Sequence, residues 1–430
     1  MDDWIQKADR AKGIVYLPGD KSLAHRALII AALAKGKSIV SNLPPSHDVV
    51  STIRCLGQLG VNIKVNNAQA EVDSDGREGF KEPNEPLDCG YSGTTVRLLA
   101  GILASCPFQV TMVGDASLSR RPMERIAAPL RLMGATVECS KKGTLPLIIR
   151  GTKLKAIHYT SPIASAQIKS SILLAGLAAE GSTKVTEPMH SRDHTERMLS
   201  HLGIDISIDG LTVTLRPGII HSFEIDLPGD PSLGAYLAAV AASLPDSILT
   251  LKKLLINPLR MGAFDAFTAM GASVKVSNPE QRMGESVGDV TINYKGLGDA
   301  SLDSVWTVRC LDEIPALAVA ALASDGQLTV NGIQELRIKE SDRVEGIRRL
   351  SLALGGYFKS SEDWFIVSGP SSPPKSKQII PVADDHRLVM AVAAAAAIFG
   401  NLIPDDPNAV APGHPGFVKL MNSILERNNL

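Results

Sequence analysis

Six stretches of the sequence share one pattern of apolar and polar positions. Each begins with polar residues, continues as an Ala- and Leu-rich run with helical spacing, and ends in a small-residue turn before a β-rich segment. In the first stretch, Pro18-Gly19 predicts a turn. Asp20 and Ser22 are candidate N-caps, so we expect a helix to start near Lys21. The stretches recur roughly seventy residues apart, which indicates an internal repeat. Their polar openings are Lys21-Ser22, Ser92-Gly93-Thr94, Ser165-Ala166-Gln167, Asp230-Pro231-Ser232, Asp312-Glu313 and Asp385-His386-Arg387.

A second marker, a Leu-Gly or Met-Gly pair, lies between these openings in the first five repeats. Each pair follows an amphipathic run and precedes a segment of alternating polarity, so we expect it to end a helix and lead into a strand. Each repeat therefore holds two helices and several strands. The pairs are Leu59-Gly60, Met133-Gly134, Leu202-Gly203, Met270-Gly271 and Leu354-Gly355.

The length of 430 residues is too great for one compact core. The repeats are too long for a solenoid, and we expect two globular domains of three repeats each. The Pro-Gly turn within residues 226–230 is the predicted seam. Ile14-Val15-Tyr16 predicts a short strand that could pair with either domain. If the three helix N-termini of each domain aim at a common centre, the cleft between the domains is a site for anions.

Composition narrows the class of protein. Hydrophobic residues make up 44% of the chain and aromatic residues 4%, so the cores are built from Ala, Leu, Ile and Val. A net charge of -1 without a basic run argues against nucleic acid or an anionic membrane surface as a partner. The five cysteines are scattered and indicate neither disulfides nor a zinc site. The N-terminus lacks a secretory segment, and the Ala-rich run 389–399 is too short to span a bilayer. We expect a cytoplasmic protein that acts on small molecules.

The opening of the first repeat is a candidate anion site. Lys21, Ser22 and Arg26 lie within the first turns of a helix whose backbone N–H groups are open to a ligand. The alternative is an ordinary capped helix with solvated basic residues. A nucleotide-phosphate loop is excluded, because Asp20 and Val15 stand where that motif needs glycines.

The second repeat supplies two further candidates. Ser92 and Gly93 at a helix start allow the backbone to approach a ligand closely, although a plain turn would look the same. Arg120 and Arg121 lie in a loop between a strand and a helix, and arginine suits bidentate binding of phosphate or carboxylate. A solvated basic pair is the alternative.

In the third repeat, polar residues open an apolar helix predicted over 168–179. Ser165 and Gln167 must therefore be capped or face a ligand. The charged stretch 191–197 is expected to cap another helix. We assign Ser191 to a ligand and the rest of this stretch to structural ion pairs.

The last two repeats contribute carboxylates and cations. Asp312 lies at a helix entrance beside Glu313, where capping is the alternative interpretation. The charged segment 335–343 precedes a helix predicted over 344–354, and it alternates with apolar residues, which suggests that several of its side chains point inward. Arg387 adds another cation at the opening of the Ala-rich helix.

Taken together, these motifs resemble those of the 5-enolpyruvylshikimate-3-phosphate synthase family, the 3-phosphoshikimate 1-carboxyvinyltransferases. The resemblance runs from Pro18 to about Phe417. It implies an inside-out α/β barrel fold with two similar domains of three βαβαββ repeats each. Domain I would comprise residues 1–18 and 228–430, domain II residues 19–227, and the active site would lie in the interdomain cleft. The motifs are Pro-Gly-Asp-Lys-Ser, Ser-Gly-Thr-Thr-x-Arg, Arg-Pro-Met, Ser-Ala-Gln, Asp-Glu-x-Pro, Lys-Glu-Ser-Asp-Arg and Asp-His-Arg.

The resemblance also implies an activity. The enolpyruvyl group of phosphoenolpyruvate would pass to the 5-hydroxyl of shikimate 3-phosphate with release of phosphate, a step of the shikimate pathway to chorismate and the aromatic amino acids. Asp312 and Glu340 would be the acid/base pair, with Lys21 assisting. No metal or organic cofactor is implied, and a monomer is expected. By similarity, shikimate 3-phosphate would be held by Lys21, Ser22, Arg26, Ser165, Gln167, Ser191, Asp312 and Lys339, and phosphoenolpyruvate by Lys21, Gly93, Arg121, Gln167, Arg343 and Arg387.

Three positions depart from the family pattern. Tyr91 stands where the family usually has Asn before Ser-Gly-Thr, and Pro412 stands where it has Lys. Glu335 occupies a position where Asn is common. Because Pro412 replaces this lysine, one anion-binding cation of the family is missing. The changes affect the expected phosphoenolpyruvate side, whereas the acceptor contacts are kept.

Two alternatives remain at this point. A carboxyvinyltransferase for a UDP-amino sugar would carry Cys five residues before the Arg of Arg-Pro, where this chain has Ala116. A paralogue that binds anions without turnover is supported by Tyr91 and Pro412. The retained charges of Asp312 and Glu340 argue against it, because converging buried charges are costly to keep without a function.

Overall fold

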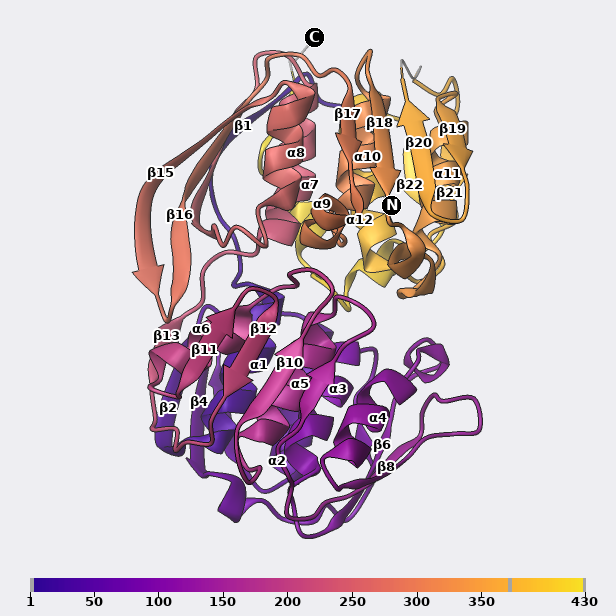
Figure 1. Ribbon diagram of the computed structural model, residues 1–430. Coiled ribbons are helices and arrows are strands. Elements are labelled where there is room, and N and C mark those ends of the chain that lie inside the picture. The colour runs from indigo at the N-terminus through magenta and orange to yellow at the C-terminus, as the bar shows by residue number, and fades with distance from the viewer. Residues whose placement is uncertain (1–3, 370–372, 428–430) are drawn as a thin grey trace. The chain divides into compact units, whose positions relative to one another are not determined.

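The computed structural model describes residues 4–369 and 373–427, which fold as two compact units. Figure 1 shows the chain coloured from one end to the other. Because the sequence passes repeatedly from one unit to the other, neither unit is a single continuous segment. Unit 1 is made of the described parts of Met1–Pro18, Pro228–Glu280 and Ser286–Leu430, and unit 2 of Gly19–Leu227 and Gln281–Glu285.

The centre of unit 2 is formed by three helices, α1 (Lys21–Leu33), α3 (Gly93–Leu103) and α5 (Ala166–Gly176). They are buried along most of their lengths, and the sheets lie outside them (Figure 1). Small residues allow this packing. A Cβ atom at Gly101 would lie 2.1 Å from the carbonyl oxygen of Ser171, so only glycine lets α3 and α5 approach so closely.

Three four-stranded sheets surround these helices in the orders β13-β2-β4-β3, β5-β6-β8-β7 and β9-β10-β12-β11. In each sheet the first two strands are parallel and the other two are added antiparallel, which is the arrangement of a βαβαββ repeat. The strands are β2 (Lys35–Ser41), β3 (Asn62–Asn66), β4 (Gln69–Asp75), β5 (Leu87–Asp88), β6 (Gln109–Val113), β7 (Thr136–Glu138), β8 (Leu147–Arg150), β9 (His158–Thr160), β10 (Thr183–Thr186), β11 (Ile206–Asp209), β12 (Thr212–Leu215) and β13 (Glu224–Asp226). The outer helices are α2 (His47–Gln58), α4 (Glu124–Leu132) and α6 (His194–His201), with 3-10 turns η1 (Arg77–Gly79) and η2 (Leu118–Arg120).

Unit 1 likewise has three central helices, α7 (Pro231–Ser243), α10 (Ile314–Leu322) and α12 (His386–Phe399), but among the described residues its sheets differ in size. Its sheets have the orders β15-β16-β14-β1-β23, β17-β18-β20-β19 and β21-β22. The strands are β1 (Arg10–Tyr16), β14 (Ile248–Leu255), β15 (Ser273–Arg282), β16 (Glu285–Asn293), β17 (Ala300–Leu302), β18 (Gln327–Asn331), β19 (Tyr357–Ser360), β20 (Trp364–Ser368), β21 (Gln378–Ile380), β22 (Leu402–Pro404) and β23 (Leu425–Glu426). The remaining helices are α8 (Gly262–Met270), α9 (Ser304–Arg309), α11 (Arg343–Ala353) and α13 (Phe417–Asn422), with η3 (Gln334–Ile338) and η4 (Pro407–Val410).

The first sheet of each unit takes one strand from a distant part of the chain. β1 pairs in parallel with β14, and β13 pairs in parallel with β2. The two segments that leave these strands share the sequence Leu-Pro-Gly-Asp and the same backbone contacts. The N–H of Gly19 donates to the carbonyl of Asn42 over 3.0 Å, and that of Gly229 donates to the carbonyl of Lys253 over 2.8 Å. Both acceptors have a positive φ, 57° and 50°. The segments 17–20 and 227–230, by which the chain leaves β1 and β13, are therefore copies of one turn.

The glycine markers between the repeat openings end helices, as the sequence predicts. Gly271 has a φ of 116° and joins the end of α8 to the start of β15. The corresponding glycines after α2, α4, α6 and α11 also have positive φ. This left-handed conformation is open to glycine without a Cβ penalty, which explains why the same residue recurs at each helix end.

The α/β fold with repeated βαβαββ units that the resemblance implies is confirmed, and the elements expected from the sequence are found with small shifts at their ends. The helix expected over 168–179 begins two residues earlier and ends at Gly176, and the helix expected from 344 begins at Arg343. Ile14-Val15-Tyr16 lies in β1, which pairs with unit 1. Among the residues that the structure describes, no helix is long and apolar enough to cross a membrane.

Candidate active site

The residues singled out from the sequence fall into one cluster on each unit. Each cluster gathers at the openings of the unit's central helices. The unit 2 cluster contains Lys21, Ser22, Arg26, Gly93, Arg121, Ser165, Gln167 and Ser191, and the unit 1 cluster contains Asp312, Lys339, Glu340, Arg343 and Arg387.

The opening of α1 presents Lys21. Asp20, rather than Ser22, caps the helix, because its carboxylate accepts the backbone N–H of Leu23 over 2.8 Å. The ammonium of Lys21 lies 2.7 Å from the carboxylate of Asp48, and the two side chains are 19% and 12% exposed. Asp48 therefore fixes the position of Lys21. The sequence analysis missed it, since Asp48 looks like any acid in the first turn of a helix.

Two guanidinium groups meet at the opening of α3. A Cβ atom at Gly93 would lie 2.6 Å from Nη1 of Arg97 and 3.3 Å from Nη1 of Arg121. Nη1 of Arg97 donates to the amide oxygen of Gln167 over 2.7 Å, and the amide nitrogen of Gln167 donates to the hydroxyl of Thr94 over 3.0 Å. Glycine thus leaves room for the two guanidinium groups at this opening, and Arg97 joins the residues that the sequence had singled out.

Arg26 lies beneath the opening of α1 and is 3% exposed. Its Nε donates to the hydroxyl of Thr195 and its Nη2 to that of Ser170, both over 2.9 Å. Its Nη1 donates to the carbonyl of Ser22 over 3.0 Å. These bonds tie α1 to α5 and α6 and hold the backbone of Ser22 in place.

Ser165 and Ser191 converge on one carboxylate, that of Glu187, which nothing in the sequence had marked. The hydroxyl of Ser191 donates to Oε1 of Glu187 over 2.6 Å, and the backbone N–H of Ser165 donates to the same oxygen over 3.2 Å. The expected structural ion pair in this stretch is present, because Arg197 lies 2.8 Å from Asp193.

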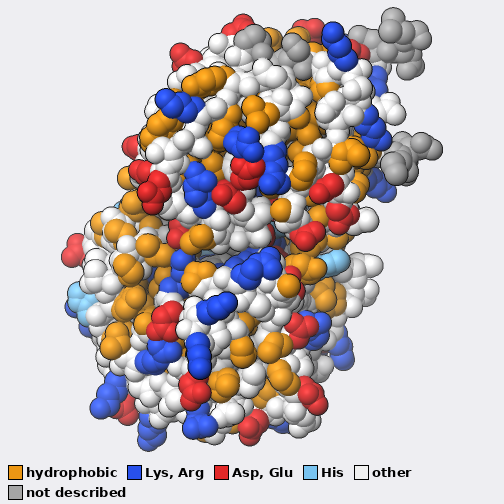
Figure 2. Space-filling model, turned by 90° about the vertical axis from the view of Figure 1, so that its right-hand side faces the viewer, with side chains coloured by type: hydrophobic (Ala, Val, Ile, Leu, Met, Phe, Trp, Pro, Cys, Tyr) orange, Lys and Arg blue, Asp and Glu red, His pale blue; other side chains and the backbone are white. Residues whose placement is uncertain are grey.

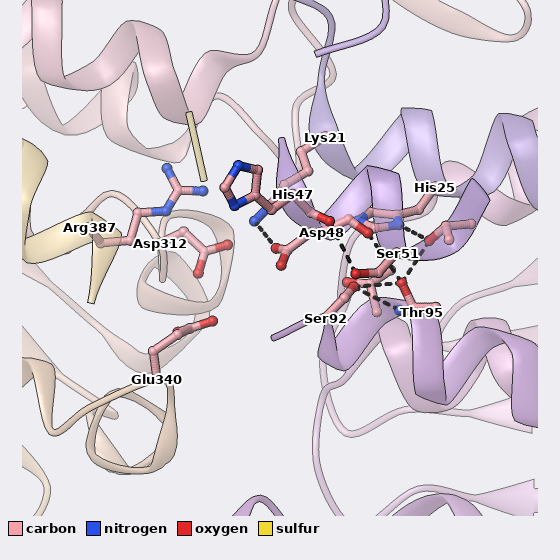
Figure 3. Close-up of polar contacts among 12 residues, drawn as sticks. Lys21, His25, His47, Asp48, Ser51, Ser92, Thr95, Asp312, Glu340 and Arg387 are labelled. Carbon is pink, nitrogen blue, oxygen red and sulfur yellow. Dashed lines mark hydrogen bonds and ion pairs between the residues drawn. The ribbon is translucent and has the colours of Figure 1, made fainter. Parts of the chain in front are cut away.

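A chain of buried hydroxyls runs beneath Lys21 to the opening of α3 (Figure 3). Nδ1 of His25 is 2.7 Å from the hydroxyl of Thr52, which is 2.6 Å from that of Thr95. The hydroxyl of Thr95 donates to that of Ser92 over 2.7 Å, and Ser92 caps α3. Burial holds the pKa of His25 well below its ordinary value, and the two cations of α1 lower this pKa further.

This buried histidine predicts a pH dependence of stability. The pKa of His25 is lower in the folded state than in the unfolded state. Below about pH 6.5, His25 is therefore protonated in the unfolded chain but still neutral in the folded chain. The free energy of unfolding is therefore unaffected by the protonation of His25 above that pH, and it falls by up to about 1.4 kcal/mol per pH unit as the pH is lowered. We expect His25→Asn to flatten the dependence on pH of the free energy of unfolding, measured in urea between about pH 5 and 7.5. Curves that stay parallel in the wild type and the variant would contradict this interpretation.

The unit 1 cluster is built around Arg343, whose side chain is 1% exposed. Its Nε lies 2.9 Å from Asp385, its Nη1 3.0 Å from Asp312 and its Nη2 2.5 Å from Glu340. Although burial alone would lower the pKa of Arg343, these carboxylates raise it well above its ordinary value. One buried cation thus holds the carboxylates from three segments of the chain.

Asp312 is held at both its ends. Its backbone carbonyl accepts the hydroxyl of Tyr236 over 3.2 Å, and its carboxylate lies 3.8 Å from the ammonium of Lys339 as well as beside Arg343. Arg387 starts α12 nearby, and the charge of Asp312 helps to raise the pKa of this arginine against the effect of burial. Figure 3 shows the side chains of Asp312, Glu340 and Arg387 close to one another.

The positions that depart from the family pattern border these clusters. Tyr91 is 43% exposed in the turn before α3. Beside Pro412, a Cβ atom at Gly413 would lie 2.3 Å from the ring of His386, so this turn packs directly on the start of α12. Glu335 lies in η3 and is partly buried.

One group of side chains has the composition of a metal site. The ligand atoms of Asp193, His194 and Glu285 lie within 4.8 Å of one another. However, Nδ1 of His194 is 2.6 Å from Glu285, and Arg197 is 2.8 Å from Asp193. The three side chains therefore pair with one another and with Arg197, as in a structural network of ion pairs.

Side chains of both charge signs lie on the surface of the protein. The face shown in Figure 2 carries Lys and Arg side chains interspersed with Asp and Glu. This agrees with totals of 44 basic and 45 acidic residues.

Comparison with known proteins shows which family of proteins this chain resembles. A family model for EPSP synthase (3-phosphoshikimate 1-carboxyvinyltransferase) matches residues 5–421. The chain is 39% identical to the 3-phosphoshikimate 1-carboxyvinyltransferase of Syntrophomonas wolfei over 416 residues, which cover 96% of this chain and 97% of that protein. It is 40% identical to the protein of the same name from Endomicrobium trichonymphae over 429 residues, which cover 99% and 100%.

Solved structures give the same result. The EPSP synthase of Acinetobacter baumannii matches with a TM-score of 0.86 at 36% identity, covering 99% of this chain and 98% of that one. The enolpyruvyl transferase NikO of Streptomyces tendae matches with a TM-score of 0.77 at 18% identity, covering 98% and 96%, which is a likeness of fold alone.

The repeated α/β plan is therefore the fold of solved enolpyruvyl transferases. Within this class, the match over nearly the whole length decides the family. The chain belongs to the EPSP synthase family of 3-phosphoshikimate 1-carboxyvinyltransferases. It is a transferase of the shikimate pathway, and its activity is enolpyruvyl transfer from phosphoenolpyruvate to shikimate 3-phosphate.

Proposed function

We propose that the two clusters act on the same pair of substrates and divide the work of this transfer. Both substrates are polyanions that repel each other, so fixed cations are needed to bring them together. The proposed contacts to shikimate 3-phosphate are Lys21, Ser22, Arg26, Ser165, Gln167, Ser191, Asp312 and Lys339, and those to phosphoenolpyruvate are Lys21, Gly93, Arg121, Gln167, Arg343 and Arg387.

The observation that carries the proposal is the gathering around Arg343. Asp312 and Glu340 lie 3.0 and 2.5 Å from its guanidinium group, and Lys339 is 3.8 Å from Asp312. Two carboxylates with different cationic neighbours are suited to opposite roles in proton transfer. We assign the acid/base steps to this pair.

The chemistry is an addition followed by an elimination. A base removes the proton of the acceptor's 5-hydroxyl while an acid protonates the methylene carbon of phosphoenolpyruvate, and the oxygen attacks the cation-like carbon. Phosphate then leaves from the tetrahedral intermediate, and the proton on the methyl carbon returns to the enzyme. Lys21, fixed by Asp48 at 2.7 Å, supplies positive charge beside the reacting groups.

The test is a phosphate-release assay on the purified protein. We expect release only when shikimate 3-phosphate and phosphoenolpyruvate are both present, and we expect Lys21→Ala to lower the rate strongly. Release from phosphoenolpyruvate without an acceptor, or release that survives Lys21→Ala unchanged, would overturn the proposal. A UDP-amino sugar in place of shikimate 3-phosphate serves as the control acceptor and should give no release.

We also propose that the enzyme works in the cytoplasm and as a monomer. All five cysteines are thiols, which fits a reducing compartment. Size-exclusion chromatography at assay concentration tests the oligomeric state, and elution as a dimer would contradict it.

A further inference from the structure

A buried ion cluster behind the serines of unit 2 takes no part in the proposed chemistry. The ammonium of Lys169 lies 2.7 Å from a carboxylate oxygen of Glu187 and 2.7 Å from one of Glu196. The three side chains are only 3%, 4% and 2% exposed. Ions buried in this way lose their hydration, and replacing them by apolar residues often costs nothing in stability. Their presence therefore calls for an explanation beyond stability.

The two carboxylates differ in what else they bind. Oε1 of Glu187 accepts the hydroxyl of Ser191 over 2.6 Å and the backbone N–H of Ser165 over 3.2 Å. Its other oxygen accepts the backbone N–H of Ser191 over 3.4 Å and faces Lys169. Glu187 thus connects the opening of α5 with the loop before α6, which are separate segments of the chain. No such bond to either serine is recorded for Glu196 among the described residues.

The charges of the cluster explain the presence of the lysine. Burial raises the pKa of Glu196, which favours its neutral form. Burial alone would lower the pKa of Lys169, but the two carboxylates raise it, so the ammonium stays charged. A lone carboxylate beside an anion site would repel the anion. The ion pair of Lys169 with Glu187 reduces the repulsion between this carboxylate and an anionic ligand, so that Glu187 can orient the serines beside it.

On the basis of the proposed function, we infer that Glu187 is a positioning residue for the acceptor. It holds Ser165 and Ser191 at the spacing at which they contact shikimate 3-phosphate, and Lys169 pairs with it. The residue acts through the serines and takes no part in proton transfer. Its loss should therefore weaken acceptor binding and leave the chemical step unchanged.

Glu187→Gln, with Glu196→Gln as the matched control, separates positioning from structural support. Both variants replace one carboxylate of Lys169 by an amide of the same size, but only the first touches the serines. We expect Glu187→Gln to raise KM for shikimate 3-phosphate, and the Kd from calorimetry, by about ten-fold or more, the effect of losing a hydrogen bond to a charged group. We expect kcat and KM for phosphoenolpyruvate to stay within about two-fold. Glu196→Gln should leave all three constants within about two-fold.

A second variant keeps the inference testable if Glu187→Gln does not fold. Glu187→Asp retains a charge for Lys169 but withdraws the carboxylate from the serines, and it should raise the same KM. An unchanged acceptor KM in the folded variant, or an equal rise in Glu196→Gln, would overturn the positioning role. A wild-type protein without acceptor-dependent phosphate release would instead overturn the proposed function, so the two failures are distinguishable.

Discussion

Replacing Glu340 by Gln or Asp312 by Asn should lower kcat by about 100- to 10,000-fold, the range attributed to a single general acid or base. The amides keep the size of the side chains but do not exchange protons at neutral pH. Both changes also remove negative charge next to Arg343, which lies 2.5 Å from Glu340 and 3.0 Å from Asp312. Phosphoenolpyruvate should therefore bind as well as before or better, and the main loss should appear in kcat. KM for shikimate 3-phosphate should rise only in Asp312→Asn, which loses a proposed contact to that substrate.

The measurement is steady-state phosphate release, with each substrate varied in turn. Glu345→Gln is the control on α11, the helix that carries Arg343, because Glu345 pairs with Arg348 and Arg349 and lies outside both clusters. Its kcat should stay within about two-fold of the wild type. If KM for phosphoenolpyruvate rises in step with the fall in kcat, Asp312 and Glu340 serve binding rather than proton transfer.

Local signals carried most of what the sequence predicted about the fold. A helix opening needs a side chain that accepts a backbone N–H, and Asp20, Ser92 and Asp385 each provide one. A helix end before a strand favours a residue with positive φ, and glycine occupies these positions from Gly60 to Gly355. Both signals involve only neighbouring residues, so the repeat could be recognised without any knowledge of its packing.

Such local signals could not predict contacts between segments that lie far apart in the sequence. Asp48 and Glu187 hold Lys21 and Ser191, but nothing around them in the sequence marks them as different from other acids. The segment Gln281–Glu285 lies in a hairpin of unit 1 strands and packs with unit 2, where Glu285 meets His194 at 2.6 Å. The partners of such residues are set by tertiary packing, which the order of residues along the chain does not reveal.

Arg26 illustrates the difference between what local spacing predicts and what tertiary packing adds. Its spacing from Ser22, four positions along a helix, predicts that both face the same ligand. The structure adds hydroxyl partners from Ser170 and Thr195, which lie far along the chain. A substitution at Arg26 would therefore disturb helix packing as well as any ligand, which makes it a poor probe of binding. Lys21, which pairs with Asp48 and is partly exposed, is the sharper probe.

The largest effect on stability is expected at Arg343. Arg343→Met fills the same space but leaves Asp312, Glu340 and the fully buried Asp385 without this cation. Breaking a buried ion network by removing one partner typically costs about 3–5 kcal/mol, because the remaining charges stay desolvated. We expect a loss of this size in the free energy of unfolding, measured in urea, together with a loss of phosphate release.

Arg348→Met is the control for Arg343→Met. Arg348 lies on the same helix and pairs with Glu345 at 2.7 Å, but the two side chains are 43% and 33% exposed. An exposed pair contributes little, so the change should stay within about 1 kcal/mol. Equal stability losses in the two variants would show that Arg343 does not hold the unit 1 cluster together.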